Sequence, residues 1–332
     1  MIKTIYFFGT SHTAGGGFEF GSKLNSFRID GEDVEENDEP RGDILKRVYS
    51  ELYPNEIQTQ ENFSFPGQFK KLLFEKGIDI EVINISKQGY GNERIYRKFY
   101  DLIRTDNFKK EESLFIFEFS DVERKELFYK PLDNHIVINY GAVNRTFETN
   151  KVDKGKYIDD DKVEIGGYAK SYWYETDSDI EILKEDKTFF EEYVTKTLTA
   201  KHQIHILNYN NINFFSFLKL NNFNFLISEM HNCLYDDLKI YYNFIKEHFI
   251  SFTCYKNKKY NGFLDLVHKN NLLIAGETKF EYADRHPSLL ANKIIAKNIF
   301  NECVNRNLIK SESIKLTKKD FTFKIYENKS IF

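Results

Sequence analysis

Three residues at opposite ends of the chain carry the side chains of a nucleophile, a base and an acid. Ser11 follows an apolar, β-prone run at 2–8, whereas Asp284 and His286 lie near the other end, just before an apolar helical pattern. A serine hydroxyl becomes a nucleophile at neutral pH when a histidine within hydrogen-bond reach accepts its proton and a carboxylate orients that histidine. If the fold brings them together, these residues would carry out acyl transfer through Ser11.

Each of these residues also has a simpler interpretation. Ser11 could be a turn residue or a helix N-cap, and Asp284 could cap the final helix with His286 exposed beside it. The glycines at 15–17 could form a phosphate loop, although the pattern is neither G-x-x-x-x-G-K-[ST] nor G-x-G-x-x-G. Asp284 and His286 lack a third ligand, so we expect no metal site. Taken jointly, the three residues favour the catalytic interpretation.

Strand-like and helix-like patterns alternate along the chain. The sequence predicts strands at 2–8, 78–85, 113–119 and 202–207, and helices at 65–77, 93–103, 186–198, 234–249 and 288–303. This alternation is typical of a parallel sheet with helices on both faces. Because ligands bind beyond the carboxyl ends of such strands, we expect Ser11, residues 89–92 and Ser120-Asp121 to meet at one edge. Within the predicted fourth strand, His202 and His205 are expected to be structural.

Composition limits the class of protein. The chain has 332 residues, 41% hydrophobic and 30% charged, with a net charge of −4, which gives no basic surface for nucleic acid. Its three cysteines form no C-x-x-C pair, so we expect a reducing compartment and no disulfide framework. No apolar run approaches the roughly 20 residues of a membrane span, and no signal-peptide pattern is recognised. We therefore expect a cytoplasmic protein, or one carried on a phage or similar particle.

Three short blocks, in order, resemble the SGNH (GDSL-type) hydrolases. Residues 9–11 (Gly-Thr-Ser) resemble the family's Gly-Asp-Ser block, and 84–89 (Asn-Ile-Ser-Lys-Gln-Gly) its second block. Residues 284–287 (Asp-Arg-His-Pro) resemble the block that holds the catalytic Asp and His. The resemblance implies Ser11 as nucleophile, His286 as base and Asp284 as the orienting acid.

The same resemblance implies an oxyanion hole, the set of donors that stabilises the developing negative charge. Its first donor would be the Ser11 backbone N–H, and its second the Gly89 N–H. The family's third donor is an asparagine in a Gly-x-Asn-Asp block after the third strand, but residues 119–124 contain no asparagine. Asn92 is the candidate for that place, and its alternative role is that of a helix N-cap.

The resemblance further implies an α/β fold, a three-layer α/β/α sandwich with a flavodoxin-like parallel sheet of about five strands. We expect one SGNH-like domain at 1–308, with insertions at about 18–60 and 128–185 and a C-terminal extension at 309–332. The expected activity is that of a serine esterase acting on a small-molecule or glycan ester, such as an O-acetyl group, without a cofactor. The alternatives are a carbohydrate O-acyltransferase with the same triad and a non-catalytic binding or structural module.

Overall fold

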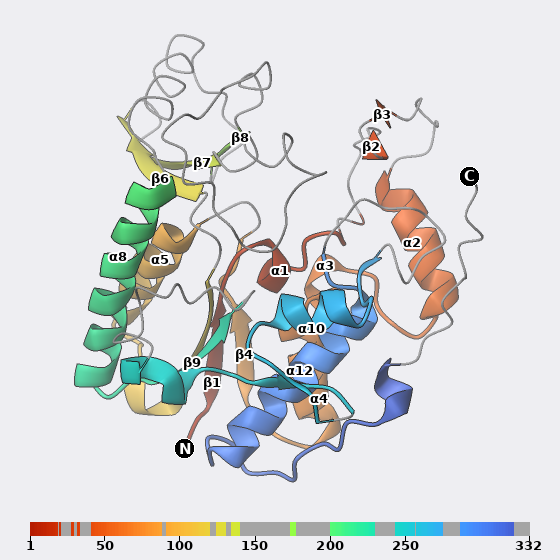
Figure 1. Cartoon of the computed structure of the whole chain (residues 1–332). Helices are drawn as coiled ribbons and strands as arrows, with labels where there is room; N and C mark the ends of the chain where they lie inside the picture. Colours follow the sequence, from red (N-terminus) through yellow and green to blue (C-terminus); the bar gives the residue numbers. More distant parts are fainter. Residues whose placement is uncertain are drawn as a thin grey trace. The chain divides into compact units, whose positions relative to one another are not determined.

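The chain forms two compact units, one made of Met1–Gln88, Lys109–Glu118 and Phe223–Phe332, the other of Gly89–Phe108 and Phe119–Asn222. Figure 1 shows the computed structural model on which this description rests. It describes residues 1–18, 20, 28–29, 32–33, 41–87, 91–119, 124–130, 134–139, 173–176, 200–229, 243–255, 257–274 and 286–321. Among these, no helix is long and apolar enough to cross a membrane.

The first unit is built on a four-stranded parallel sheet. Its strands are β1 (Thr4–Phe8), β4 (Glu81–Asn84), β5 (Ser113–Phe119) and β9 (Asn224–Glu229), in the order β4-β1-β5-β9. β1 pairs in parallel with both β4 and β5, and its register places Phe8 opposite Phe117. Strands buried on both faces are nearly all apolar, as β5 is. The predicted α/β character and parallel sheet are thus confirmed.

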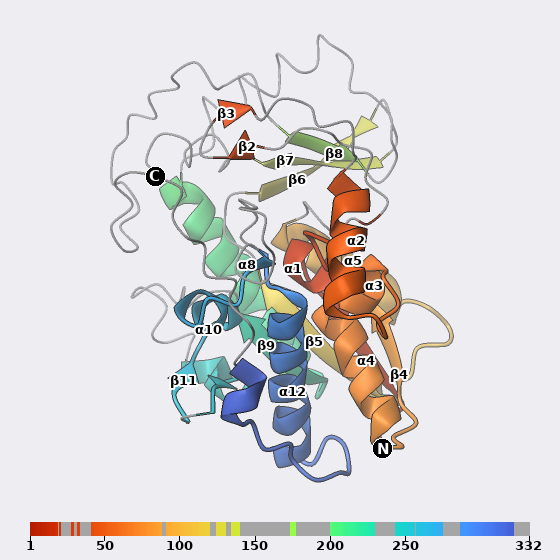
Figure 2. The same cartoon turned by 90° about the vertical axis from the view of Figure 1, so that its right-hand side faces the viewer.

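Two helices cover one face of this sheet. α4 (Phe65–Glu75) and α12 (Leu289–Asn305) pack against each other over the strands, as Figure 2 shows. Ile5 and Phe7 of β1 are fully buried in the hydrophobic core that these helices complete. Each helix begins at a serine cap, because Ser64 Oγ accepts from Gly67 N at 3.1 Å and Ser288 Oγ accepts from Ala291 N at 3.2 Å.

The first unit contains further helices and short strands. They are α1 (Ser11–Ala14), β2 (Arg28–Ile29), β3 (Glu32–Asp33), α2 (Arg41–Leu52), α3 (Gln60–Phe63), η1 (Lys110–Glu112), η4 (Lys246–His248), β10 (Phe252–Thr253), β11 (Lys259–Tyr260), α10 (Phe263–Lys269) and η5 (Lys318–Phe321). A second core cluster, with Phe18, Tyr49, Phe63 and Leu289 all fully buried, joins α2, α3 and the start of α12 to the segment after α1.

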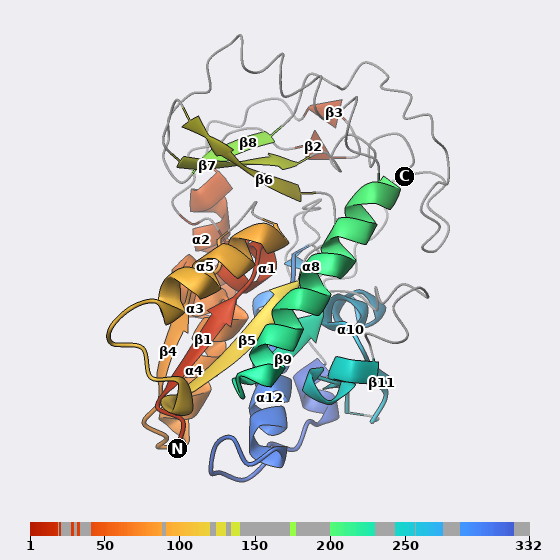
Figure 3. The ribbon, with the colours of Figure 1, turned by 90° about the vertical axis from the view of Figure 1, so that its left-hand side faces the viewer.

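The second unit combines two helices with a small antiparallel sheet. The helices are α5 (Asn92–Ile103) and α8 (Ala200–Leu220), and the sheet is β6 (Arg124–Tyr129), β7 (Asn134–Asn139) and β8 (Trp173–Thr176). Figure 3 shows α5 and α8. Aromatic rings join the two helices, with the Phe99 and Phe214 centroids 5.2 Å apart. Arg97 of α5 binds Glu126 of β6 through two hydrogen bonds of 3.0 and 2.6 Å.

One predicted strand is wrong. Residues 202–207, which include His202 and His205, lie in the helix α8, and the strand that follows β5 in the parallel sheet is β9. The reason is the spacing of the apolar residues further along, because Phe214, Phe215 and Leu218 are buried at intervals that match one face of a helix. The predicted helix at 186–198 lies outside the described residues.

Candidate active site

Ser11 lies just beyond the carboxyl end of β1, where the strand turns into α1. Ser11 is the first residue of this short helix, Thr10 is its N-cap and Gly15 closes it in the left-handed conformation, at φ +82°. Only 5% of Ser11 is exposed. The strand thus delivers the serine to the edge of the sheet at which ligands bind in parallel α/β folds.

His286, near the other end of the chain, meets the Ser11 segment at Gly16. A Cβ atom placed on Gly16 would lie 2.8 Å from His286 Nε2 and 2.9 Å from the Ser11 carbonyl oxygen. The imidazole therefore turns its Nε2 edge toward the turn that carries Ser11, and only a glycine leaves room for both groups at this position. His286 is partly exposed and Pro287 beside it is buried.

His12 is a neighbour of His286 that the sequence did not single out. The centroids of the two imidazole rings lie 4.8 Å apart, and the His12 ring meets the edge of Phe263 of α10 at 5.7 Å. The His12 residue is only 9% exposed, whereas His286 is partly exposed. A histidine directly after a candidate nucleophile is the one sequence signal that could have marked it.

Glu118, near the carboxyl end of β5, is a second residue of the site that the sequence did not indicate. Its side chain is buried, and it accepts hydrogen bonds from the backbone N–H groups of Thr10 at 3.1 Å and Thr13 at 3.0 Å. The Thr10 hydroxyl donates to it at 2.8 Å, and the Thr13 hydroxyl donates to it as well. Thr10 itself makes no side-chain cap bond to α1. Glu118 therefore caps, from the neighbouring strand, the turn that carries Ser11.

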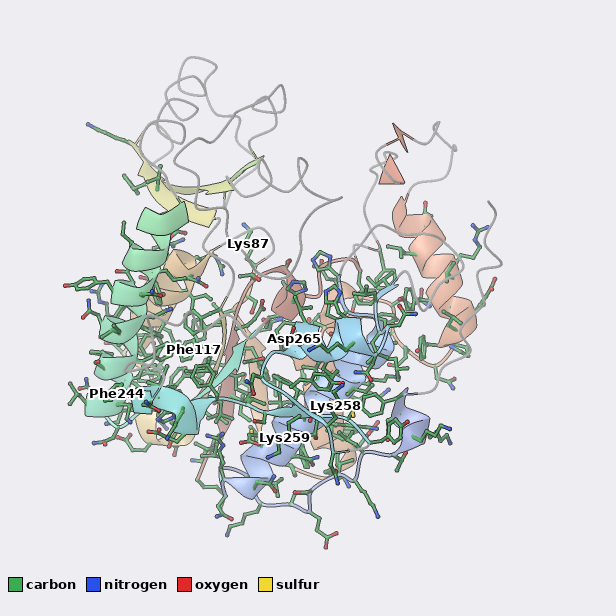
Figure 4. All side chains as sticks on the ribbon, viewed as in Figure 1. Lys87, Phe117, Phe244, Lys258, Lys259 and Asp265 are labelled. Carbon is green, nitrogen blue, oxygen red and sulfur yellow. The ribbon has the colours of Figure 1, made fainter. Side chains whose placement is uncertain are left out.

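The end of β4 is bound to the same turn. Asn84 Nδ2 donates to the Thr13 carbonyl at 3.0 Å, and Asn84 Oδ1 accepts from Ser86 N at 3.1 Å. The Lys87 N–H then reaches the Gly9 carbonyl at 3.4 Å. Figure 4 labels Lys87, and also Phe117, the buried residue before Glu118 on β5. The second sequence block thus begins in contact with the segment that carries Ser11.

Of the other candidate residues, the structure describes Asn92. Asp284, Gly89 and Ser120-Asp121 lie outside the described residues. Asn92 is the first residue of α5 in the second unit and is 4% exposed. Gly91, and not Asn92, is the N-cap of that helix. In the described part of the chain, no group of three or more His, Cys, Asp or Glu side chains could hold a metal ion.

Comparison with known proteins adds no relative from which a role could be transferred. No family model, curated protein or solved structure matches the chain. The function is therefore proposed from the geometry of the site and from the chemistry of its residues.

Proposed function

We propose that the chain is a serine esterase of the SGNH type, with Ser11 as nucleophile and His286 as general base. The observation that carries the proposal is the meeting of the Ser11 turn and the Nε2 edge of His286 at Gly16. This contact between segments from opposite ends of the sequence supports the pairing of a serine with a histidine that activates it.

The reaction follows from this pairing. Ser11 Oγ attacks the carbonyl carbon of an ester while His286 Nε2 accepts the hydroxyl proton, and the same imidazole then donates that proton to the leaving alcohol. Water, activated by His286 in the same way, hydrolyses the acyl-serine and restores the free enzyme. In this proposal Nε2 serves the serine and Nδ1 remains for an orienting carboxylate, for which Asp284 is the proposed residue.

The negative charge that develops on the carbonyl oxygen needs preorganised hydrogen-bond donors. Each donor increases kcat by about 10²- to 10³-fold. We propose the Ser11 N–H as one of these donors, and the Gly89 N–H and the Asn92 side chain stay as the donors that the resemblance implies. The Thr10 and Thr13 N–H groups point instead to Glu118. In this proposal the parallel sheet with α4 and α12 is part of a three-layer α/β/α sandwich, and the substrate is a small-molecule or glycan ester.

The experiment that tests the function replaces the nucleophile. Ser11→Ala should abolish hydrolysis of p-nitrophenyl acetate and leave the far-UV circular dichroism spectrum and the melting temperature of the wild type intact. Unchanged turnover in this variant would overturn the proposal. Transfer of the acetyl group to an added glycan, in preference to water, would assign the same site to an O-acyltransferase.

A further inference from the structure

Glu118 is a buried carboxylate that accepts hydrogen bonds from the turn that carries Ser11. The residues that donate these bonds lie on both sides of Ser11. Glu118 is 1% exposed. Its Oε2 accepts from Thr10 N, Thr13 N and the Thr13 hydroxyl, and its Oε1 accepts from the Thr10 hydroxyl. Three of these bonds therefore converge on one oxygen. The bonded residues are the one directly before Ser11 and the one two positions after it.

Gly9 shows how closely the carboxylate approaches the chain. A Cβ atom placed on Gly9 would lie under 3.0 Å from Glu118 Oε2 and from the Thr13 side chain. The register of the sheet produces this approach, since Phe8 lies opposite Phe117 and the next residues are Gly9 and Glu118. A glycine at the end of β1 is thus required for the carboxylate to reach both ends of the turn.

Building on the proposed function, we infer that Glu118 is a positioning residue for the Ser11 nucleophile, acting through its hydrogen bonds and not through its charge. The two backbone N–H groups can only donate, and both meet Oε2. Oε1 meets a hydroxyl, which can also accept. A glutamine with its amide oxygen at Oε2 and its NH₂ group at Oε1 would satisfy every partner.

Acyl transfer depends on the precise position of the nucleophile, which the hydrogen bonds of Glu118 would fix. The reacting atoms of an acyl transfer must be held about 3–3.5 Å apart, and a misplacement of about 1 Å can cost roughly 100-fold in rate. α1 has only four residues and no side-chain cap of its own. Glu118 supplies the acceptor for the Thr13 N–H that the N-cap side chain would otherwise supply, and so fixes the start of the helix relative to β5.

Paired variants of Glu118 test the inference by p-nitrophenyl acetate kinetics. Glu118→Gln should keep kcat within about threefold of the wild type, because the hydrogen bonds remain. Glu118→Ala should lower kcat by about 100-fold with KM changed less than threefold, because the nucleophile is displaced while the substrate still binds. Equal losses in the two variants would assign the effect to the charge and overturn the inference, and so would full activity of Glu118→Ala.

A milder pair of variants covers the possibility that Glu118→Ala does not fold. Thr13→Val removes one donor to Glu118 and should lower kcat by about tenfold with KM unchanged. Thr253→Val is the matched control, because it also removes a threonine hydroxyl that donates a hydrogen bond. Thr253 of β10 donates to Asn298 Oδ1 of α12 at 3.0 Å. It should lose comparable stability and keep the wild-type kcat. Equal kcat in the two variants would contradict the positioning role.

Labelling of Ser11 separates this inference from the function on which it depends. A fluorophosphonate probe should label Ser11 of the wild type quickly, Glu118→Gln at a similar rate and Glu118→Ala about 100-fold more slowly. A wild type that is not labelled at Ser11 overturns the proposed function and the inference with it. A wild type and a Glu118→Ala variant labelled at the same rate overturn the inference alone.

Discussion

The imidazole of His12 lies against that of His286, with the two ring centroids 4.8 Å apart. Two histidines beside one serine raise the question of which accepts its proton. His286 turns Nε2 toward the Ser11 turn and is partly exposed, whereas His12 is nearly enclosed and packs on Phe263. For the proposed function, these contacts favour His286 as the base and indicate a packing role for His12.

Substitution of each histidine separates these roles. His286→Asn should lower kcat for p-nitrophenyl acetate by about 10³-fold, because the general base is lost. His12→Phe keeps an aromatic ring between Phe263 and His286, and should keep kcat within about fivefold of the wild type. Steady-state kinetics of both variants measure the difference. A His12→Phe variant as inactive as His286→Asn would instead make His12 the base.

Gly16 provides a test of the contact between the Ser11 turn and His286. In Gly16→Ala the new methyl group would lie within 3 Å of His286 Nε2 and of the Ser11 carbonyl oxygen. We expect the imidazole to be displaced and kcat to fall by at least about tenfold.

The matched control for Gly16→Ala is Gly77→Ala, because Gly77 adopts φ +66° with nothing near its Cβ position. That variant should lose about 1 kcal/mol of stability to backbone strain while its kcat stays at the wild-type value. Kinetics and thermal melts on both variants give the comparison. A fully active Gly16→Ala variant would contradict the placement of His286.

Glu56 gives a prediction about stability and pH. It binds Lys71 of α4 at 2.9 Å and Lys293 of α12 at 2.8 Å. Burial alone raises the pKa of Glu56, but the hydrogen bonds and charges of Lys293 and Lys71 outweigh it, so the net pKa lies below the usual value. A lowered pKa in the folded state stabilises the fold above the unfolded pKa of about 4.3, and this stabilisation disappears as the pH falls through the folded pKa.

Glu56→Gln should therefore lower the free energy of unfolding by about 1 kcal/mol at pH 7, and the difference from the wild type should close as the pH falls through the folded pKa of Glu56. Urea unfolding at a series of pH values measures it. Glu112→Gln serves as the control, since the Lys3–Glu112 pair lies at the surface and is screened by water and salt. A gap that widened as the pH fell would contradict the assigned direction of the pKa shift.

The strong periodic patterns of the sequence were sufficient to predict the central elements of the first unit, but not α2, which lies within the expected insertion at 18–60. The buried runs of β1 and β5 and the apolar faces of α4 and α12 match their predicted positions closely. The strand β9 was missed because its apolar residues follow the apolar end of the long helix α8 almost without a break. Asn222, with φ +53°, marks the turn between them, and an Asn-Asn pair before an apolar run was the available signal.

The site was predictable only in part, for a physical reason. Ser11 and His286 could be chosen because their side chains have chemistry of their own. Glu118 could not, because inside an apolar strand its role depends on the register that sets it beside Gly9. The contact of His12 with His286 likewise arises from tertiary packing, which no local pattern specifies.

Covalent labelling shows whether Ser11 is a nucleophile that His286 activates. The protein would be incubated with a fluorophosphonate, digested and mapped by mass spectrometry. The account predicts one adduct, on Ser11, that forms rapidly in the wild type, is absent in Ser11→Ala and is strongly slowed in His286→Asn. No adduct on Ser11 of the wild type, or an equal rate in His286→Asn, would contradict it.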